Sequence, residues 1–215
     1  CWQNGTRLNY QGEYYKHDLM IPYYNPGPLE YGRPPIYLAA INKLMCQLCG
    51  KMADGHLPGD PITNKWHEEI MLPNLEIGAK KTGRSLNDID LGSYGFIGCA
   101  TTDEGLERMR AGLKERVALY ASTPEYKDML DMHGWDVNLT DFIEMARAQK
   151  WKQMGELVSD EMLEAYAVIE KPADLPAALK KRFGSTVNRI QIDETWFDGL
   201  TDDDTEKLVA EIKKL

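Results

Sequence analysis

The chain has 215 residues, of which 43% are hydrophobic and 27% are charged, proportions that are ordinary for a globular protein with a full core. Its 34 acidic and 25 basic residues give a net charge of -9, which disfavours nucleic acid and anionic membranes as partners. With no apolar run of 18 residues and no signal-peptide pattern, we expect a cytoplasmic protein without a membrane span. The first residue is Cys1 rather than Met, from which we expect an N-terminus that is processed, trimmed or incomplete.

The first third of the chain predicts a hairpin, a loop and one strand–helix unit. Aromatic-containing runs flank Gln11-Gly12 within residues 6–16, a pattern typical of a β-hairpin with a tight turn. A loop rich in Pro, Tyr and Gly follows. Residues 36–41 (IYLAAI) then form a short apolar run that suits a strand buried on both faces. Asn42 is the expected cap of the next helix, whose apolar stripe we expect at Leu44, Met45, Leu48, Cys49 and Met52.

Three further strands are predicted at residues 54–57, 89–99 and 187–192. The helices between them are expected to begin near Thr63, Thr102, Ser159 and Pro172, and a last helix near Thr201. We expect Pro73 to kink the helix that contains it. We expect the helix that begins at Ser159 to continue through Ala167. Four strand–helix units can form an open parallel sheet or half of an eight-fold βα barrel, and we expect one folding unit over residues 1–215.

One stretch resembles a known family. The run PPIYLAAINKLMCQLCGKMADGHLP, residues 34–58, contains Pro34-Pro35, Ala39-Ala40, Met45 and Ala53-Asp54-Gly55. In this order it resembles the fifth strand, helix and sixth strand of the bacterial luciferase-like monooxygenase family. The upstream WQNGTRLNYQGEYYKHDLMIP is similar to the family's hairpin insertion. LPNLEIGAKKTGRSLNDIDL is similar to its approach to the seventh strand. LYASTPEYKDMLDMHGW and LVSDEMLEAYAVIEKPADL resemble the subfamily that uses the deazaflavin coenzyme F-420.

The resemblance implies a fold, a cofactor and an activity. The fold is the α/β (β/α)8 TIM barrel, of which this chain carries the C-terminal half and an opening hairpin. The implied cofactor is F-420 or FMN, bound at the C-terminal ends of the strands. The implied activity is hydride transfer to or from a small organic substrate, or monooxygenation with FMN, in a homodimer. The first four strands, which are outside this chain, carry much of the cofactor-ring pocket and the usual proton-transfer residues, so the catalytic residues are unknown.

Two features are candidates for cofactor binding. The turn Ala39-Ala40-Ile41-Asn42-Lys43 joins a strand to a helix N-terminus, where free N–H groups and the helix dipole favour a phosphate. By resemblance, this turn would hold the cofactor's phosphate and ribityl chain; the alternative is an ordinary βα turn. His56 is expected at the end of the next strand, on the ligand side of a barrel, where it could hydrogen-bond the cofactor or substrate. The alternative is a half-exposed loop histidine.

Two other functions remain open. The chain could be a non-catalytic, flavin-binding partial barrel or an enzyme fragment. It could also be a thiol oxidoreductase that uses Cys46-Gln47-Leu48-Cys49, although Cys46 lies a turn too deep in its helix for an activated thiol. We expect no metal site, because no second pair of ligands stands at zinc spacing.

Overall fold

The computed structural model describes residues 1–135, 137–184 and 186–215. These residues form two compact units, Cys1–Ile36 and Tyr37–Leu215, where the sequence predicts a single domain. Among the described residues, no helix is both long enough and apolar enough to cross a membrane.

The first unit is a small hairpin with a long tail and no buried residue. Strands β1 (Tyr10–Gln11) and β2 (Lys16–His17) are antiparallel, and Tyr10 pairs with His17. The predicted hairpin is therefore confirmed. Its turn is centred on Glu13 and Tyr14, two residues later than expected, and Gly12 N–H donates across it to the carbonyl of Tyr15 at 2.9 Å. A 3-10 turn at Pro22–Tyr24 follows.

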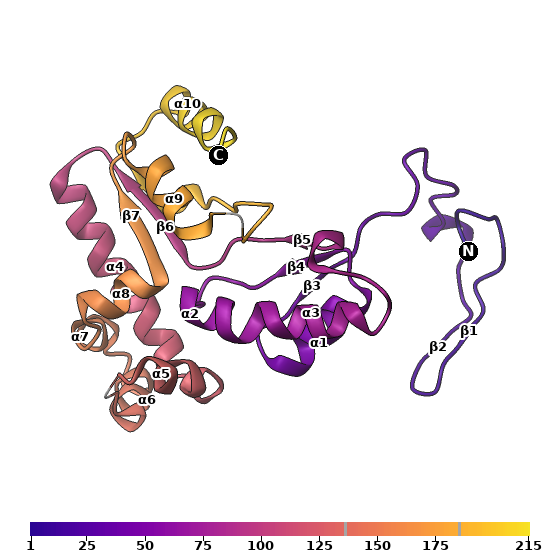
Figure 1. Ribbon diagram of the computed structural model, residues 1–215, viewed down its shortest axis with the longest axis horizontal. Helices are drawn as coiled ribbons and strands as arrows, with labels where there is room; N and C mark the ends of the chain where they lie inside the picture. Colours follow the sequence, from indigo (N-terminus) through magenta and orange to yellow (C-terminus); the bar gives the residue numbers. More distant parts are fainter. Residues whose placement is uncertain (136, 185) are drawn as a thin grey trace. The chain divides into compact units, whose positions relative to one another are not determined.

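The second unit begins with a parallel sheet in the order β3 (Tyr37–Ala39), β4 (Gly55–Leu57) and β5 (Asp90–Leu91). Helix α1 (Lys43–Met52) connects β3 to β4, and α2 (Asn64–Trp66), a π-helical segment (His67–Met71) and α3 (Leu72–Lys80) precede β5. Figure 1 shows α1 and α3 side by side along these strands. The interruption expected at Pro73 appears as the π segment just before it, where the missing proline N–H is tolerated.

The predicted fourth strand, residues 187–192, lies parallel to β5 but forms only one bridge, between Gly92 and Arg189. The Asn188 and Arg189 N–H groups donate to the carbonyl of Leu91 at 2.7 and 3.1 Å, and Ser93 N–H donates to the carbonyl of Arg189 at 2.7 Å. The segment therefore runs along the sheet as predicted, with less regular pairing than a full strand.

A second parallel sheet has the order β7 (Ala167–Glu170), β6 (Phe96–Ala100) and β8 (Phe197–Asp198). The single strand predicted at 89–99 is interrupted at Gly95, whose φ of +77° breaks it into β5 and β6. Neither β7 nor β8 was predicted. The expectation that the helix from Ser159 continues through Ala167 is wrong: α8 (Asp160–Tyr166) stops one residue earlier. The β-branched pair Val168-Ile169 instead pairs with Ile97 and Gly98 of β6.

Arg182 closes the end of α8. Its guanidinium donates to the carbonyls of Glu164, Ala165 and Ala167 at 3.2, 2.8 and 3.4 Å. Because these carbonyl groups at the end of α8 have hydrogen-bond donors, the helix can end there and the chain can continue into β7. Burial lowers the pKa of Arg182 to about 10, and its guanidinium also lies 5.7 Å from the ring centre of Tyr94.

Helices pack against the second sheet, and the longest of them is α4. Helix α4 (Asp103–Ala121) begins as predicted, with Thr102 accepting from Gly105 N–H at 3.0 Å, and buries Met109, Leu113 and Val117. The remaining elements are a 3-10 turn at Leu86–Asp88, a 3-10 turn at Pro124–Tyr126, α5 (Lys127–His133), α6 (Leu139–Arg147), α7 (Trp151–Glu156), α9 (Leu175–Phe183), a 3-10 turn at Glu194–Trp196 and α10 (Asp202–Ile212). The helix expected from Pro172 begins three residues later, at Leu175.

The apolar stripe predicted for α1 is mostly wrong. The residues that α1 buries are Cys46, Cys49 and Gly50, whereas Leu44 is 80% exposed and Met52 67% exposed. The reason is the close approach of α1 to α3. A Cβ on Gly50 would lie 2.0 Å from the carbonyl oxygen of Leu75, and one on Gly78 would lie 2.0 Å from that of Gln47. Small residues therefore face α3, and most of the large apolar side chains lie outside the contact.

Candidate functional site

The strongest candidate site is a cavity of about 410 Å³ at the carboxyl ends of β3, β4, β5 and the segment 187–192. We call it the strand-end cavity. Side chains alternate along a strand, and Ala39 and Ile41 of the first segment and Arg189 and Gln191 of the last line it at alternate positions. Its walls are Ala39, Ile41, Leu57, Pro58, Gly59, Asp60, Pro61, Gly92, Ser93, Tyr120, Tyr126, Arg189 and Gln191. Ligands of parallel α/β folds bind at this end of the strands.

The predicted turn, residues 39–43, borders this cavity through Ala39 and Ile41, whereas Ala40 is buried. Asn42 occupies the N-cap position of α1, as predicted, but its side chain makes no capping hydrogen bond. Within the described parts of the chain, the N–H groups of residues 41–45 donate no hydrogen bond. The turn therefore presents a run of free donors beside the cavity.

His56 is fully buried. Its neighbours on β4, Gly55 and Leu57, belong to the other face of the strand, and Leu57 lines the cavity. His56 Nε2 lies 2.7 Å from the carbonyl oxygen of Ala40, inside the turn. Burial lowers the pKa of His56, and the bond to Ala40 opposes that change. The structure thus joins His56 to the turn through a backbone carbonyl; direct contact with a ligand stays a prediction.

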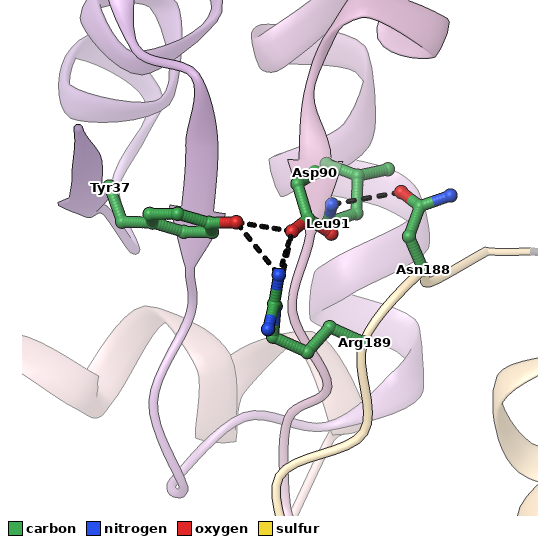
Figure 2. Close-up of polar contacts among 5 residues, drawn as sticks. All are labelled: Tyr37, Asp90, Leu91, Asn188 and Arg189. Atoms are coloured by element: carbon green, nitrogen blue, oxygen red, sulfur yellow. Dashed lines mark hydrogen bonds and ion pairs between the residues drawn. The ribbon is translucent and has the colours of Figure 1, made fainter. Parts of the chain in front are cut away.

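A polar cluster that sequence reasoning missed lies beside the cavity and shares Arg189 with its lining (Figure 2). The hydroxyl of Tyr37 donates to the Asp90 carboxylate. Arg189 donates to the same oxygen from Nε at 3.1 Å and from Nη2 at 2.6 Å. Gly55 makes this geometry possible, because a Cβ there would lie 2.1 Å from the ring of Tyr37. The sequence carried only a faint signal, namely a charged residue in each of two expected strands.

Other titratable groups surround the cavity. Burial raises the pKa of Asp60, Arg116 opposes that change, and Asp193 reinforces it. Burial also raises the pKa of Tyr126, with smaller contributions from Tyr120 and Glu125. The cavity can therefore offer hydrogen bonds, a guanidinium and a carboxyl group that protonates above its usual pH. Among the described residues, no group of three or more His, Cys, Asp or Glu side chains could hold a metal ion.

The cysteine pair is a poor candidate for redox chemistry. Cys46 and Cys49 are both fully buried. Burial, together with the neighbouring Cys49, raises the pKa of Cys46 to about 12. Burial raises that of Cys49 to about 11, with Arg84 opposing it. A reactive thiol needs a lowered pKa and access to solvent, so the structure argues against a thiol oxidoreductase.

Comparisons with known proteins identify one matching family and several relatives. The family model described as luciferase-like monooxygenase matches residues 1–189. An uncharacterized protein of Mycobacterium tuberculosis is 31% identical over 190 residues, covering 88% of this chain and 56% of the relative. The 5,10-methylenetetrahydromethanopterin reductase of Methanopyrus kandleri is 26% identical over 191 residues, covering 87% of this chain and 52% of the relative.

A comparison with solved structures shows a similar fold. The solved structure of the coenzyme F420 dependent tetrahydromethanopterin reductase from Methanopyrus kandleri matches with a TM-score of 0.70 at 21% identity. The match covers 98% of this chain and 57% of the other. The partial-barrel α/β fold expected from the sequence is therefore confirmed. The chain spans about half the length of these curated relatives.

Proposed function

Since the chain belongs to the luciferase-like monooxygenase family, we propose that it supplies the C-terminal half of a barrel oxidoreductase that transfers hydride between F-420 and a small organic substrate. FMN is the alternative cofactor. The observation that carries the proposal is the strand-end cavity, which adjoins a turn whose N–H groups have no acceptor among the described residues. Relatives named as F420-dependent support the choice of the deazaflavin. One of them is the glucose-6-phosphate dehydrogenase of Nakamurella multipartita, which is 32% identical over 87 residues. The match covers 40% of this chain and 24% of that relative.

The turn of residues 39–43 fits a phosphate group. Ala39 and Ala40 carry no bulk beyond Cβ, so a ligand can approach the backbone. The amide groups of Ile41, Asn42 and Lys43 can donate to phosphate oxygens, and the positive end of the α1 dipole and the Lys43 ammonium favour an anion there. The bound cofactor supplies the hydride chemistry, and these residues bind and orient it.

The strand-end cavity would hold the remainder of the cofactor or the substrate. Arg189, Gln191 and Ser93 offer hydrogen-bonding groups on one wall. We place the residues that transfer protons to the substrate in the other half of the barrel, which the longer relatives carry. We also propose a cytoplasmic homodimer. If the chain binds neither cofactor, the alternative of a non-catalytic fragment takes its place.

The proposal is tested by titrating the purified chain with F-420 and with FMN and following their fluorescence. We expect saturable binding of F-420. Asn42→Asp should weaken it by about tenfold or more, because a carboxylate at the N-cap repels phosphate at close range. Aspartate is also a good N-cap, so the helix should stay folded.

The matched control is Asn138→Asp, which makes the same change at the N-cap of α6. It should leave cofactor binding unchanged. Binding of FMN alone would reverse the choice of cofactor. A folded chain that binds neither cofactor would overturn the proposed function.

A further inference from the structure

Two buried side chains hold consecutive carbonyl groups of the 39–43 turn. His56 Nε2 lies 2.7 Å from the carbonyl oxygen of Ala40, and Trp66 Nε1–H donates to that of Ile41 at 3.1 Å. His56 comes from β4 and Trp66 from α2, and both are buried. Because a carbonyl oxygen only accepts hydrogen bonds, His56 Nε2 must carry the proton.

Because a trans peptide unit is planar, fixing the direction of its carbonyl group also fixes the direction of its N–H group. Within one peptide unit the C=O and N–H point in opposite directions. The Ala40 carbonyl shares its peptide unit with the Ile41 amide, and the Ile41 carbonyl shares its unit with the Asn42 amide. With both oxygens bound to His56 and Trp66, these two amides point away from that buried pair. Neither has an acceptor among the described residues.

We propose that His56 and Trp66 are positioning residues for phosphate recognition: they hold the carbonyls of Ala40 and Ile41 away from the ligand, so that the Ile41 and Asn42 amides face it. This inference rests on the proposed function and deepens it, since it assigns the phosphate-bearing part of the ligand to this turn. A carbonyl oxygen that rotated toward the phosphate would repel it, and donors that are already oriented need no reorganisation when the ligand binds. This positioning role requires no contact between the two side chains and the ligand.

The variants must separate positioning from folding. His56→Leu and Trp66→Phe remove the N–H donors and leave an apolar side chain at each position. His56→Gln restores an N–H donor at this position. His67→Leu is the matched control, because His67 is an equally buried histidine whose ring nitrogens contact no acceptor among the described residues. Circular dichroism and thermal unfolding establish that each variant is folded.

The measurement is the ratio of affinities for a phosphorylated and an unphosphorylated ligand, FMN against riboflavin and F-420 against its phosphate-free riboside. We expect His56→Leu and Trp66→Phe each to lower this ratio by about tenfold. His56→Gln should recover most of the loss, and His67→Leu should leave the ratio unchanged. If the ratio stays the same in both donor-deficient variants, or if His67→Leu lowers it equally, the inference is overturned.

A second measurement separates this inference from the proposed function. Inorganic phosphate is added to the ¹⁵N-labelled chain, and the amide shifts of Ile41 and Asn42 are followed. One outcome is that the chain binds neither cofactor, yet phosphate causes saturable amide shifts that disappear in His56→Leu. This outcome would support the positioning role and refute the cofactor proposal. Binding of a cofactor, with the same ratio of affinities for phosphorylated and unphosphorylated ligands in the donor-deficient variants, would support the cofactor proposal and refute the positioning role. If phosphate leaves both amides unmoved and neither cofactor binds, both proposals fail.

Discussion

Asp90 and Arg189 lie 99 residues apart in the sequence and meet beside the strand-end cavity, where one carboxylate oxygen accepts from both Nε and Nη2 of the guanidinium. Burial raises the pKa of Asp90, but the hydrogen bonds from Tyr37 and Arg189 outweigh it and hold the pKa below its usual value. The pair ties the segment 187–192, which has only one sheet bridge, to β5.

Loss of this pair should loosen the segment 187–192. We expect Arg189→Gln to lower the urea midpoint of unfolding by a few tenths of a molar, because Asp90 loses two hydrogen bonds and the segment loses one of the side-chain contacts that anchor it, the others being those of Asn188 with Leu91 and of Gln191 with Ser93. The control is Lys207→Gln, which breaks the exposed pair with Asp203 within α10 and should leave the midpoint almost unchanged. Equal midpoints for the two variants would contradict an anchoring role for Arg189.

His67 should make the fold sensitive to acid. Burial, reinforced by the nearby His56, lowers its pKa from 6.5 to about 3, so the folded chain keeps the ring neutral where the unfolded chain protonates it. The contribution of His67 to the free energy of unfolding should therefore be complete above pH 6.5. It should fall by about 1.4 kcal/mol per pH unit between pH 6.5 and 3. His67→Phe should remove this dependence, leaving the smaller contributions of His56 and His133.

Urea unfolding at pH 7.5, 5.5 and 4.5 measures the effect. At pH 7.5 His67→Phe should be no less stable than the parent, because it replaces a buried side chain whose nitrogens contact no acceptor among the described residues. A variant that loses stability with falling pH as steeply as the parent would refute the assignment to His67.

The contact between α1 and α3 should not tolerate a methyl group. In Gly78→Ala the new Cβ would lie 2.0 Å from the carbonyl oxygen of Gln47, which is backbone and cannot rotate away. The helices must separate, and we expect a loss of about 2–4 kcal/mol in the free energy of unfolding.

Gly112 offers the matched control. It lies within α4, and a Cβ there would contact only the ring of Trp196, at an ordinary 3.6 Å. Gly112→Ala should be neutral or stabilise by up to about 1 kcal/mol, because alanine is the better helix former. Denaturant unfolding of the two variants compares them directly, and similar stabilities would show that the two helices are not in close contact.

The cysteines should differ sharply in reactivity. Cys1 is exposed, whereas Cys46, Cys49 and Cys99 are buried, and burial raises the pKa of Cys99 to about 11. With Ellman's reagent at pH 8, we expect one thiol to react rapidly and the other three only in denaturant. Cys1→Ser should abolish the rapid phase. Rapid reaction of Cys46 or Cys49 in the folded chain would revive the thiol oxidoreductase hypothesis.

The sequence by itself determined the features that depend on neighbouring residues. Thr63, Thr102 and Ser159 cap helices where the sequence predicted, because a cap hydrogen bond spans only three residues. The strands near residues 37 and 55 and the hairpin also lie where the apolar and turn patterns indicated. The order of these segments also indicated the family, which the family model confirms.

Only the tertiary structure decided which surfaces meet. Leu44 and Met52 have the spacing of a core stripe, yet α1 buries Cys46 and Gly50 instead. The reason is that Gly78 of α3, a later helix in the sequence, allows the backbones of α1 and α3 to approach closely. Strand β7 forms because β6, about 70 residues earlier, offers it an edge. The carbonyl that orients His56 and the partners of Arg189 also come from other strands. Such contacts depend on how separate segments pack together, and the pattern within one segment does not encode them.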